Sequence, residues 1–281
     1  MLVNLGAADL FSLKGKTVLL TGASGYLGRT FSRAVLENGA RLIALGRSDR
    51  AAAEATKWQR EFGNDQVVSH QVDMYDLKAL TASLDSIIER EPRIDVLINN
   101  AHELGPGTGF NVNAGSFENA TYDQWERHFL GGVYWPALTA QKVGPKMKAQ
   151  KAGSIINIST MYALVAPTPA LYEGTGMMNP PGYSAAKAAM LALTRYLASF
   201  WGSHSIRANA ILPGPFSNVE DKSANSVAAD DPFLERLKSR TCLGRIGRPD
   251  ELVGCLLYLA SDASSYVTGQ AISVDGGWTV T

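Results

Sequence analysis

Short apolar runs recur along this chain, and stretches long enough for a helix separate one run from the next. The runs are Thr17–Thr21, Arg41–Leu45, Gln66–His70, Ile94–Ile98, Ser154–Ile158, Ile206–Leu212 and Ala271–Val274. Strands that are apolar on both faces and alternate with helices are typical of a parallel sheet buried between two helical layers. The pattern therefore predicts an α/β fold: a Rossmann-like, doubly wound parallel sheet of about seven strands, with helices on both faces.

No internal repeat, low-complexity tract or linker marks a second domain, so residues 1–281 are expected to form a single domain. The expected helices run to about Asn38 after the first strand and cover 77–91, 122–149, 183–201 and 251–260. Pro136 could bend the longest of them. Three loops, 102–120, 161–182 and 214–235, follow strands and are expected to line a pocket, with the polar, acidic segment 217–231 as a lid.

Charge and composition exclude little but favour a small-molecule function. Lys and Arg number 26 and Asp and Glu also number 26, and no basic block occurs, so nothing indicates a nucleic acid or membrane partner. The first residues lack a signal-peptide pattern, which predicts a soluble, cytoplasmic protein. Cys242 and Cys255 are expected to be reduced thiols in or near the core, and the four histidines show no metal-ligand spacing.

A glycine-rich turn joins the first strand to a helix. Its residues Gly22, Ser24, Gly25, Tyr26, Leu27 and Gly28 are where a backbone could approach a dinucleotide pyrophosphate, with the free N–H groups of the helix start facing the phosphates. Because the order strand, turn, helix is the right one, we favour a nucleotide site over a turn without a ligand.

The end of the second strand bears on the choice of cofactor. It reads Gly46-Arg47-Ser48, with no carboxylate before Asp49. An acid there usually binds the ribose 2′-hydroxyl of NAD, whereas a cation accommodates the 2′-phosphate of NADP. Arg47 and Ser48 therefore favour NADP(H), with NAD(H) still open and a purely surface role for Arg47 as the alternative.

A tyrosine and a lysine lie four residues apart at the start of an alanine-rich helix. Tyr183 and Lys187 follow Pro180-Pro181-Gly182, and positions i and i+4 share one helix face. A nearby cation lowers the pKa of a phenol toward the range of acid–base catalysis. On its own, however, such a pair is usually a solvated helix face.

Taken in order, these motifs resemble the classical short-chain dehydrogenase/reductase (SDR) family over nearly the whole chain. The resemblance rests on the glycine turn, Asn99-Asn100-Ala101, the hydroxyl at Thr160, Tyr183-x-x-x-Lys187, Pro213-Gly214 and Asp275-Gly276-Gly277. It implies hydride transfer between a nicotinamide and a carbonyl or alcohol carbon, with Tyr183, Lys187 and Thr160 as catalytic residues. It also implies that Asp73 and Met74 bracket the adenine, Asn100 and Ala101 the adjoining ribose, and Gly214 and Phe216 the nicotinamide carboxamide. Family members commonly form homodimers or homotetramers.

The chain departs from the family pattern at four places. Gly25 precedes the usual second glycine position, His102 replaces the glycine after Asn-Asn-Ala, Thr160 stands in the serine place, and Gly132 stands where an asparagine usually supports a relay water. Threonine keeps the hydroxyl. His102 or His128 could substitute for the asparagine, although an isolated histidine is usually structural.

The substrate and two other functions stay open. His102, Tyr162, Tyr172 and Glu173 are expected as substrate contacts, and the long loop before Tyr183 is similar to that of family members acting on sugars, which suggests a sugar or polyol derivative. The alternatives are a non-catalytic dinucleotide sensor or scaffold, and a nucleotide-sugar epimerase or dehydratase. The second is disfavoured because fewer than 100 residues follow Lys187.

Overall fold

The computed structural model describes residues 6–216 and 232–281, so the segment predicted to be a lid, 217–231, lies outside the described residues. The strands are β1 (Thr17–Thr21), β2 (Arg41–Gly46), β3 (Val67–Gln71), β4 (Val96–Asn99), β5 (Gly153–Ile158), β6 (Ile206–Pro213) and β7 (Ala271–Val274). The helices are α1 (Ala7–Phe11), α2 (Tyr26–Glu37), α3 (Asp49–Phe62), α4 (Leu77–Arg90), α5 (Tyr122–Phe129), α6 (Trp135–Gln150), α7 (Pro181–Trp201), α8 (Pro232–Ser239) and α9 (Val253–Ala260).

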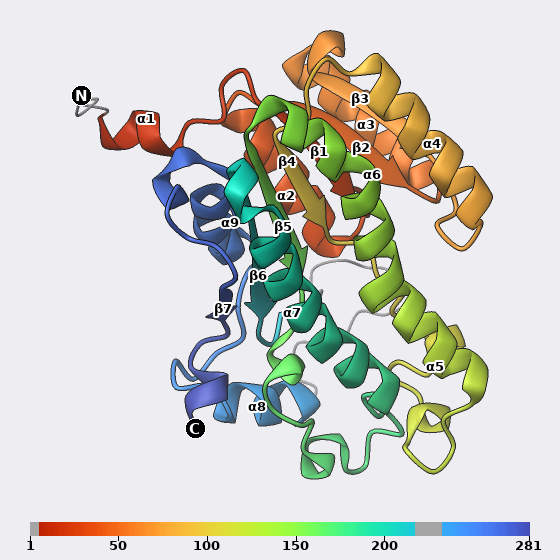
Figure 1. Ribbon diagram of the computed structural model, residues 1–281. Helices are drawn as coiled ribbons and strands as arrows, with labels where there is room; N and C mark the ends of the chain where they lie inside the picture. The colour runs from red at the N-terminus through yellow and green to blue at the C-terminus, as the bar shows by residue number, and fades with distance from the viewer. Residues whose placement is uncertain (1–5, 217–231) are drawn as a thin grey trace.

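Within the described residues the strands form one sheet in the order β3-β2-β1-β4-β5-β6-β7, and every neighbouring pair is parallel. This confirms the predicted seven-stranded, doubly wound sheet. The chain order reverses between β1 and β4, which is where open α/β sheets bind ligands beyond the strand ends. The loops after β4 and β5, together with α8, lie beyond that end of the sheet, at the bottom of Figure 1.

Alternate residues of each strand enter two different cores. Val18, Leu20 and Val96 pack with α2, α3 and α9, whereas Leu19 and Leu97 pack with α4, α6 and the end of α7. The second group of helices crosses the near face of the sheet in Figure 1. Both faces are therefore dry, as the continuous apolar runs of the strands require.

The predicted long helix is interrupted, and not at Pro136 itself. α5 and α6 are joined by a π-helical segment, Leu130–Tyr134. Pro136 has no N–H to donate to the carbonyl four residues earlier, at Gly132, so the irregularity falls in the turn before the proline. Gly132 also has a low helix propensity, and it packs closely against α7, so a regular α-helical turn is not favoured at this position.

Other differences concern short elements and one cysteine. The sequence pattern did not indicate α1, α3 or α8. Cys255 is partly buried as expected, but Cys242 is exposed, so its prediction as a core or near-core thiol is wrong. In the described part of the chain, the helices are too short or too polar to span a membrane.

Candidate active site

The parallel register brings the ends of β1, β4 and β5 to one level. Thr21 pairs with Asn99, and Asn99 pairs with Asn157. The Thr21 hydroxyl accepts hydrogen bonds from the N–H groups of Asn100 and Ala101, both at 3.1 Å. The loops that follow these strands therefore start from a fixed edge, which supports the expectation of a site there.

The glycine turn is closely packed against both α2 and the β4 loop. Gly22 has φ +67°, and a Cβ there would lie 3.0 Å from the Cα of Ala101. A Cβ on Gly28 would lie 2.0 Å from the carbonyl oxygen of Gly22, so only glycine fits. Gly25 is the N-cap of α2 and offers no side chain to its first-turn N–H groups, which a phosphate can therefore take. The turn fits a dinucleotide pyrophosphate.

The structure brings Tyr183, Lys187 and Thr160 together. Pro180 and Pro181 begin α7, and two residues later Tyr183 is buried; Lys187, on the same face, is only 3% exposed. The buried Thr160 side chain lies close enough to Tyr183 to act on its pKa. The Lys187 ammonium lies 6.0 Å from the centre of the tyrosine ring and donates to the Ile158 carbonyl at 2.8 Å.

The acid–base properties of this group differ from the sequence expectation. Burial raises the pKa of Tyr183 to about 12, and the Thr160 side chain opposes this. Burial also lowers the pKa of Lys187 to about 7. The predicted lowering of the tyrosine pKa by Lys187 is therefore absent in this state of the protein, because desolvation dominates for both groups and Lys187 is bonded to a backbone carbonyl.

The predicted cofactor residues at the β2 and β3 ends lie on the surface side of the same edge. Arg47 and Ser48 are exposed, Ser48 caps α3, and the exposed Asp73 precedes the buried Met74. The sequence analysis did not single out Glu103, although this acid lies at the same edge. Its carboxylate accepts hydrogen bonds from the Tyr75 hydroxyl at 2.5 Å and from Arg127 at 3.2 Å. Its other oxygen lies 4.0 Å from Arg47. The position of Glu103 directly after His102, in the loop that follows β4, is the sequence feature that could have indicated it.

On the opposite side of Tyr183, aromatic residues of the loop 161–182 form a cluster. Tyr162 and Tyr172 are buried, with their hydroxyl oxygens 3.3 Å apart, and they pack with Tyr183, Phe233 and Trp278. Glu173 does not join them. Its side chain is exposed, and its carbonyl accepts a hydrogen bond from Arg236. The prediction of Tyr162 and Tyr172 near the pocket fits this geometry, whereas Glu173 faces solvent because the chain turns outward there.

The predicted carboxamide-binding residues lie beyond β6. A Cβ on Gly214 would lie 2.5 Å from the Cα of Asp275, so this turn is pressed against the segment that follows β7. Phe216 forms a parallel bridge with Gly247 and packs its ring on that glycine. Gly214 thus lies against the motif Asp275-Gly276-Gly277, whose aspartate accepts from the N–H groups of Gly277 and Thr279 at 3.0 Å.

Comparison with known proteins decides the family. The family described as enoyl-(acyl carrier protein) reductase matches residues 22–279. A sorbose reductase of Candida albicans is 34% identical over 275 residues, 96% of this chain and 89% of that protein. Among solved structures, a short-chain type dehydrogenase/reductase from Mycobacterium marinum has 28% identity and a TM-score of 0.80, covering 99% of this chain and 100% of that one.

The chain belongs to the short-chain dehydrogenase/reductase family. A gluconate 5-dehydrogenase from Burkholderia cenocepacia, solved in complex with NADP and tartrate, has 29% identity and a TM-score of 0.83, covering 98% of this chain and 100% of that one. This SDR is thus a nicotinamide-dependent oxidoreductase, as the ordered motifs predicted.

Two of the departures from the SDR pattern are linked in space. His102 and His128 stack with ring centres 5.4 Å apart, and Nε2 of His102 lies 3.1 Å from Nδ1 of His128. Nε2 of His128 lies 2.8 Å from the carbonyl oxygen of Thr108. Both rings meet Tyr183 edge to face, with centres 5.2 Å and 5.9 Å away. No spacing rule indicated this pair, because its members are 26 residues apart.

Burial and the nearby Lys187 lower the pKa of both histidines, most strongly that of His102, so both are neutral near pH 7. The Nδ1 atom of His102 is buried and makes no hydrogen bond. It lies beside Gly131, where a Cβ would come within 3.0 Å of it. The histidine pair therefore occupies space that the glycine of the π-helical segment leaves open.

The presence of glycine at position 132 is also explained by local packing. A Cβ on Gly132 would lie 2.7 Å from the Cβ of Ala186, between Tyr183 and Lys187 on α7. The π-helical segment and α7 are in such close contact that the usual asparagine does not fit. The relay position of this SDR is therefore filled by backbone packing and not by a side chain.

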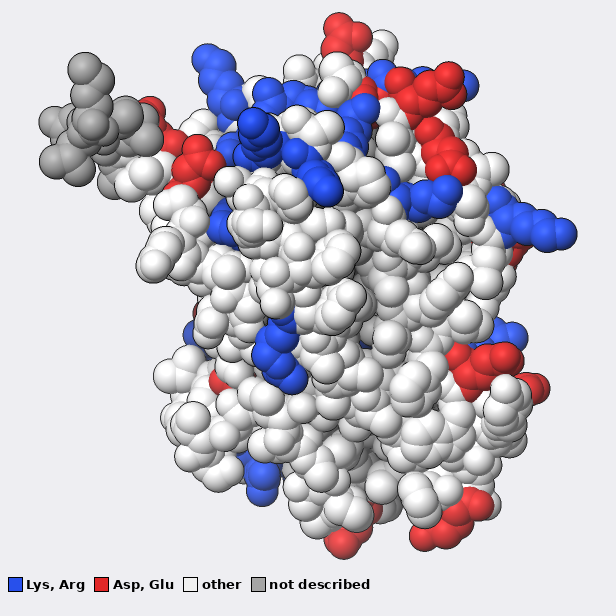
Figure 2. Space-filling view, in the orientation of Figure 1, with Lys and Arg blue, Asp and Glu red and all other residues white. Residues whose placement is uncertain are grey.

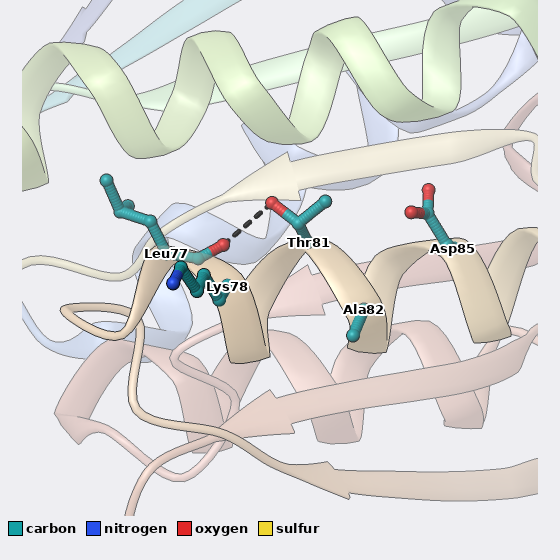
Figure 3. A pocket seen from close by; sticks show the side chains of 5 residues that line it. All are labelled: Leu77, Lys78, Thr81, Ala82 and Asp85. Carbon is teal, nitrogen blue, oxygen red and sulfur yellow. Dashed lines mark hydrogen bonds between the residues drawn. The ribbon is translucent and has the colours of Figure 1, made fainter.

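Two surface hollows of the described residues lie away from this site. One, of about 440 Å³, runs along α4 and is lined by Leu77, Lys78, Thr81, Ala82 and Asp85 (Figure 3). The other, of about 590 Å³, lies at the amino ends of β5 and β6, beside Asp95, Arg207 and Asp262. Neither includes a predicted site residue. No group of metal-ligating side chains occurs in residues 6–216 and 232–281.

Proposed function

We propose that this SDR transfers a hydride between NADP(H) and a carbonyl or alcohol carbon of a sugar-like substrate, with Tyr183 exchanging the proton. The observation that carries the proposal is the buried group of Tyr183, Thr160 and Lys187 at the sheet edge that also holds the glycine turn. A buried phenol with a lysine on the same helix face has no evident use in a protein that only binds the nucleotide.

Each member of this group has a chemical task. In oxidation Tyr183 takes the proton from the substrate hydroxyl, and in reduction it gives a proton to the carbonyl oxygen. Thr160, whose side chain lies near Tyr183, would hydrogen-bond the same substrate oxygen. Lys187 can supply the positive charge that favours the phenolate. When bound, the nicotinamide supplies or accepts the hydride.

The residues that would hold the cofactor lie along the ends of β1, β2, β3, β4 and β6 and at the start of α7. They are the predicted set Gly22, Ser24, Gly25, Tyr26, Leu27, Gly28, Arg47, Ser48, Asp73, Met74, Asn100, Ala101, Tyr183, Lys187, Gly214 and Phe216. The close backbone approach at Gly22 and Gly28 supports this assignment.

The decisive experiment replaces the phenol. We expect Tyr183→Phe to lower kcat about 100-fold or more on an active substrate, because acid–base catalysis contributes that much, while NADPH binding measured by fluorescence titration is retained. If the variant matched the parent in turnover, Tyr183 would not be the acid. If the parent bound NADPH but turned over no carbonyl, alcohol or sugar substrate, the sensor alternative would stand instead.

Preference for NADP over NAD is proposed on Arg47 and Ser48. Arg47 is exposed and meets Glu103 at 4.0 Å, a contact weak enough for a 2′-phosphate to replace. We expect Arg47→Gln to weaken NADPH binding about 10-fold or more and to leave NADH binding unchanged. Tighter binding of NADH than NADPH by the parent protein would overturn the preference.

The relatives support a sugar or polyol derivative as substrate. They include the sorbose reductase and gluconate 5-dehydrogenase named above and a galactitol 2-dehydrogenase of Cereibacter sphaeroides, 31% identical over 271 residues. The nucleotide-sugar epimerase alternative has less support, since these relatives match over nearly the whole chain and are named as reductases and dehydrogenases.

A further inference from the structure

Arg240, just after α8, has a buried guanidinium nitrogen without a partner. Its Nε makes no hydrogen bond, and its guanidinium lies 5.5 Å from the ring centre of Trp278. Across residues 6–216 and 232–281 it forms no ion pair. An unpaired, buried N–H of a charged group is costly and calls for a reason.

Comparable arginines of this chain are paired. The part-buried Arg207 donates to Ser264 and to backbone carbonyls, and Arg236, one turn before Arg240, donates to the carbonyls of Leu171 and Glu173. Arg41 forms two hydrogen bonds with Glu91. The lack of a hydrogen-bond partner for the Arg240 side chain therefore distinguishes it from these other part-buried arginines.

Arg240 lies next to the buried aromatic cluster that contains Tyr183. Its charge acts on the Tyr162 hydroxyl, whose ring meets Trp278 edge to face at 6.2 Å. Tyr162 in turn interacts electrostatically with Tyr183, and both belong to the same buried aromatic cluster. The Tyr162 side chain thus lies between the Arg240 guanidinium and the Tyr183 phenol in this chain of interactions.

The same cluster offers groups for hydroxyls. Asn179 is buried near the Tyr172 hydroxyl, and its Oδ1 atom has no partner. The Nε1 donor of Trp278 is also buried without a partner. An acceptor, a donor and a cation around an aromatic wall suit a polyhydroxylated chain that ends in an anion.

We propose that Arg240 binds the carboxylate of the substrate, so that this enzyme acts on a sugar acid in preference to a neutral polyol. The guanidinium lies over the Trp278 ring, and its side-chain N–H groups make no hydrogen bond with the described residues, so they can pair with a carboxylate. This inference rests on the proposed function, since it concerns the substrate of the same site.

The test compares acids with the alcohols that differ from them only at one carbon. The pairs are gluconate and glucitol, galactonate and galactitol, and xylonate and xylitol, each with NADP. We expect the parent to prefer an acid. Arg240→Gln should lower kcat/KM on that acid about 10- to 100-fold, mainly through KM, and leave its alcohol unchanged; Arg240→Lys should lie between.

Arg60→Gln, on the exposed face of α3, is the control for loss of a positive charge. Melting temperature and NADPH titration establish that Arg240→Gln is folded and loaded. An equal loss on acid and alcohol, or a parent that treats both alike, would overturn the assignment.

A binding measurement separates this inference from the proposed function. Millimolar acid should raise the melting temperature of the NADP-saturated parent and of Arg60→Gln, but not that of Arg240→Gln. If no pair is turned over and this difference is still seen, hydride transfer fails and the carboxylate site stands. If the acids stabilise parent and Arg240→Gln equally, or neither, the carboxylate site fails.

Discussion

Lys187 has only 3% of its surface exposed, and its burial lowers its pKa to about 7. A lysine in the unfolded chain titrates near pH 10.4. Between these two pH values the unfolded state binds more protons than the folded state, so stability rises with pH across this window. Burial of a reactive amine therefore has a cost that shrinks as the solution becomes more basic.

We predict that the free energy of unfolding of the cofactor-free protein rises by about 3 kcal/mol between pH 7 and pH 10 from this group alone. Tyr183, with its pKa raised to about 12, reverses the trend only above the ordinary tyrosine pKa of about 10. Urea denaturation across this range measures it. Lys187→Met should remove most of the rise, and an unchanged slope in that variant would contradict the burial effect.

The residues of the site differ in how much the sequence revealed. Tyr183, Lys187, Thr160 and the glycine turn stand in motifs whose order is informative, and the structure gathers them. Glu103 and Arg240 stand in no such motif. Glu103 stands out because it shares contacts with Arg47 and other side chains, and Arg240 because its buried Nε has no partner. Such partnerships join residues distant in the chain and cannot be inferred from periodicity.

At the scale of elements, the contact between the π-helical segment and α7 is the unusual one. Gly132 and Ala186 meet so closely that a Cβ on the glycine would lie 2.7 Å from the alanine methyl group. The sequence predicted one long helix over 122–149 with a possible bend at Pro136, where the structure has α5 and α6. It did not predict the π-helical segment, because that depends on the missing N–H of Pro136 and on tertiary packing.

We predict that Gly132→Asn lowers the free energy of unfolding by about 1–3 kcal/mol through overpacking. Ala186→Gly in the same chain should recover part of this loss, giving a favourable coupling energy in a double-mutant cycle measured by urea denaturation. Ala188→Gly, on the exposed side of α7, is the matched control for the helix cost of glycine. A Gly132→Asn variant as stable as the parent would contradict the close contact.

For the whole molecule, the face over α7 carries unusually few charges. Figure 2 shows Lys and Arg gathered at the top of the view and a broad area in the middle, where α7 runs in Figure 1, that is mostly uncharged but includes a basic side chain. On α7, Tyr196 and Phe200 stack with ring centres 5.7 Å apart and are 62% and 58% exposed. Exposed aromatic patches of this kind mark association surfaces.

We predict that the protein is a homodimer or homotetramer that uses this face. Phe200→Glu should shift the mass measured by light scattering toward the monomer, because a buried carboxylate has no partner there. Tyr266→Glu, at a fully exposed tyrosine elsewhere, should leave the mass unchanged. A parent protein that is monomeric at all concentrations would exclude this interface.

The hydrogen bonds of the histidine pair beside Tyr183 run in one direction. A carbonyl oxygen only accepts, so Nε2 of the neutral His128 must carry its hydrogen toward Thr108, and its Nδ1 must accept from Nε2 of His102. Nδ1 of the neutral His102 is then a bare lone pair, enclosed beside Gly131. The carbonyl of Thr108 thus fixes the tautomers of two neutral rings, and it leaves the enclosed Nδ1 of His102 without a hydrogen-bond partner.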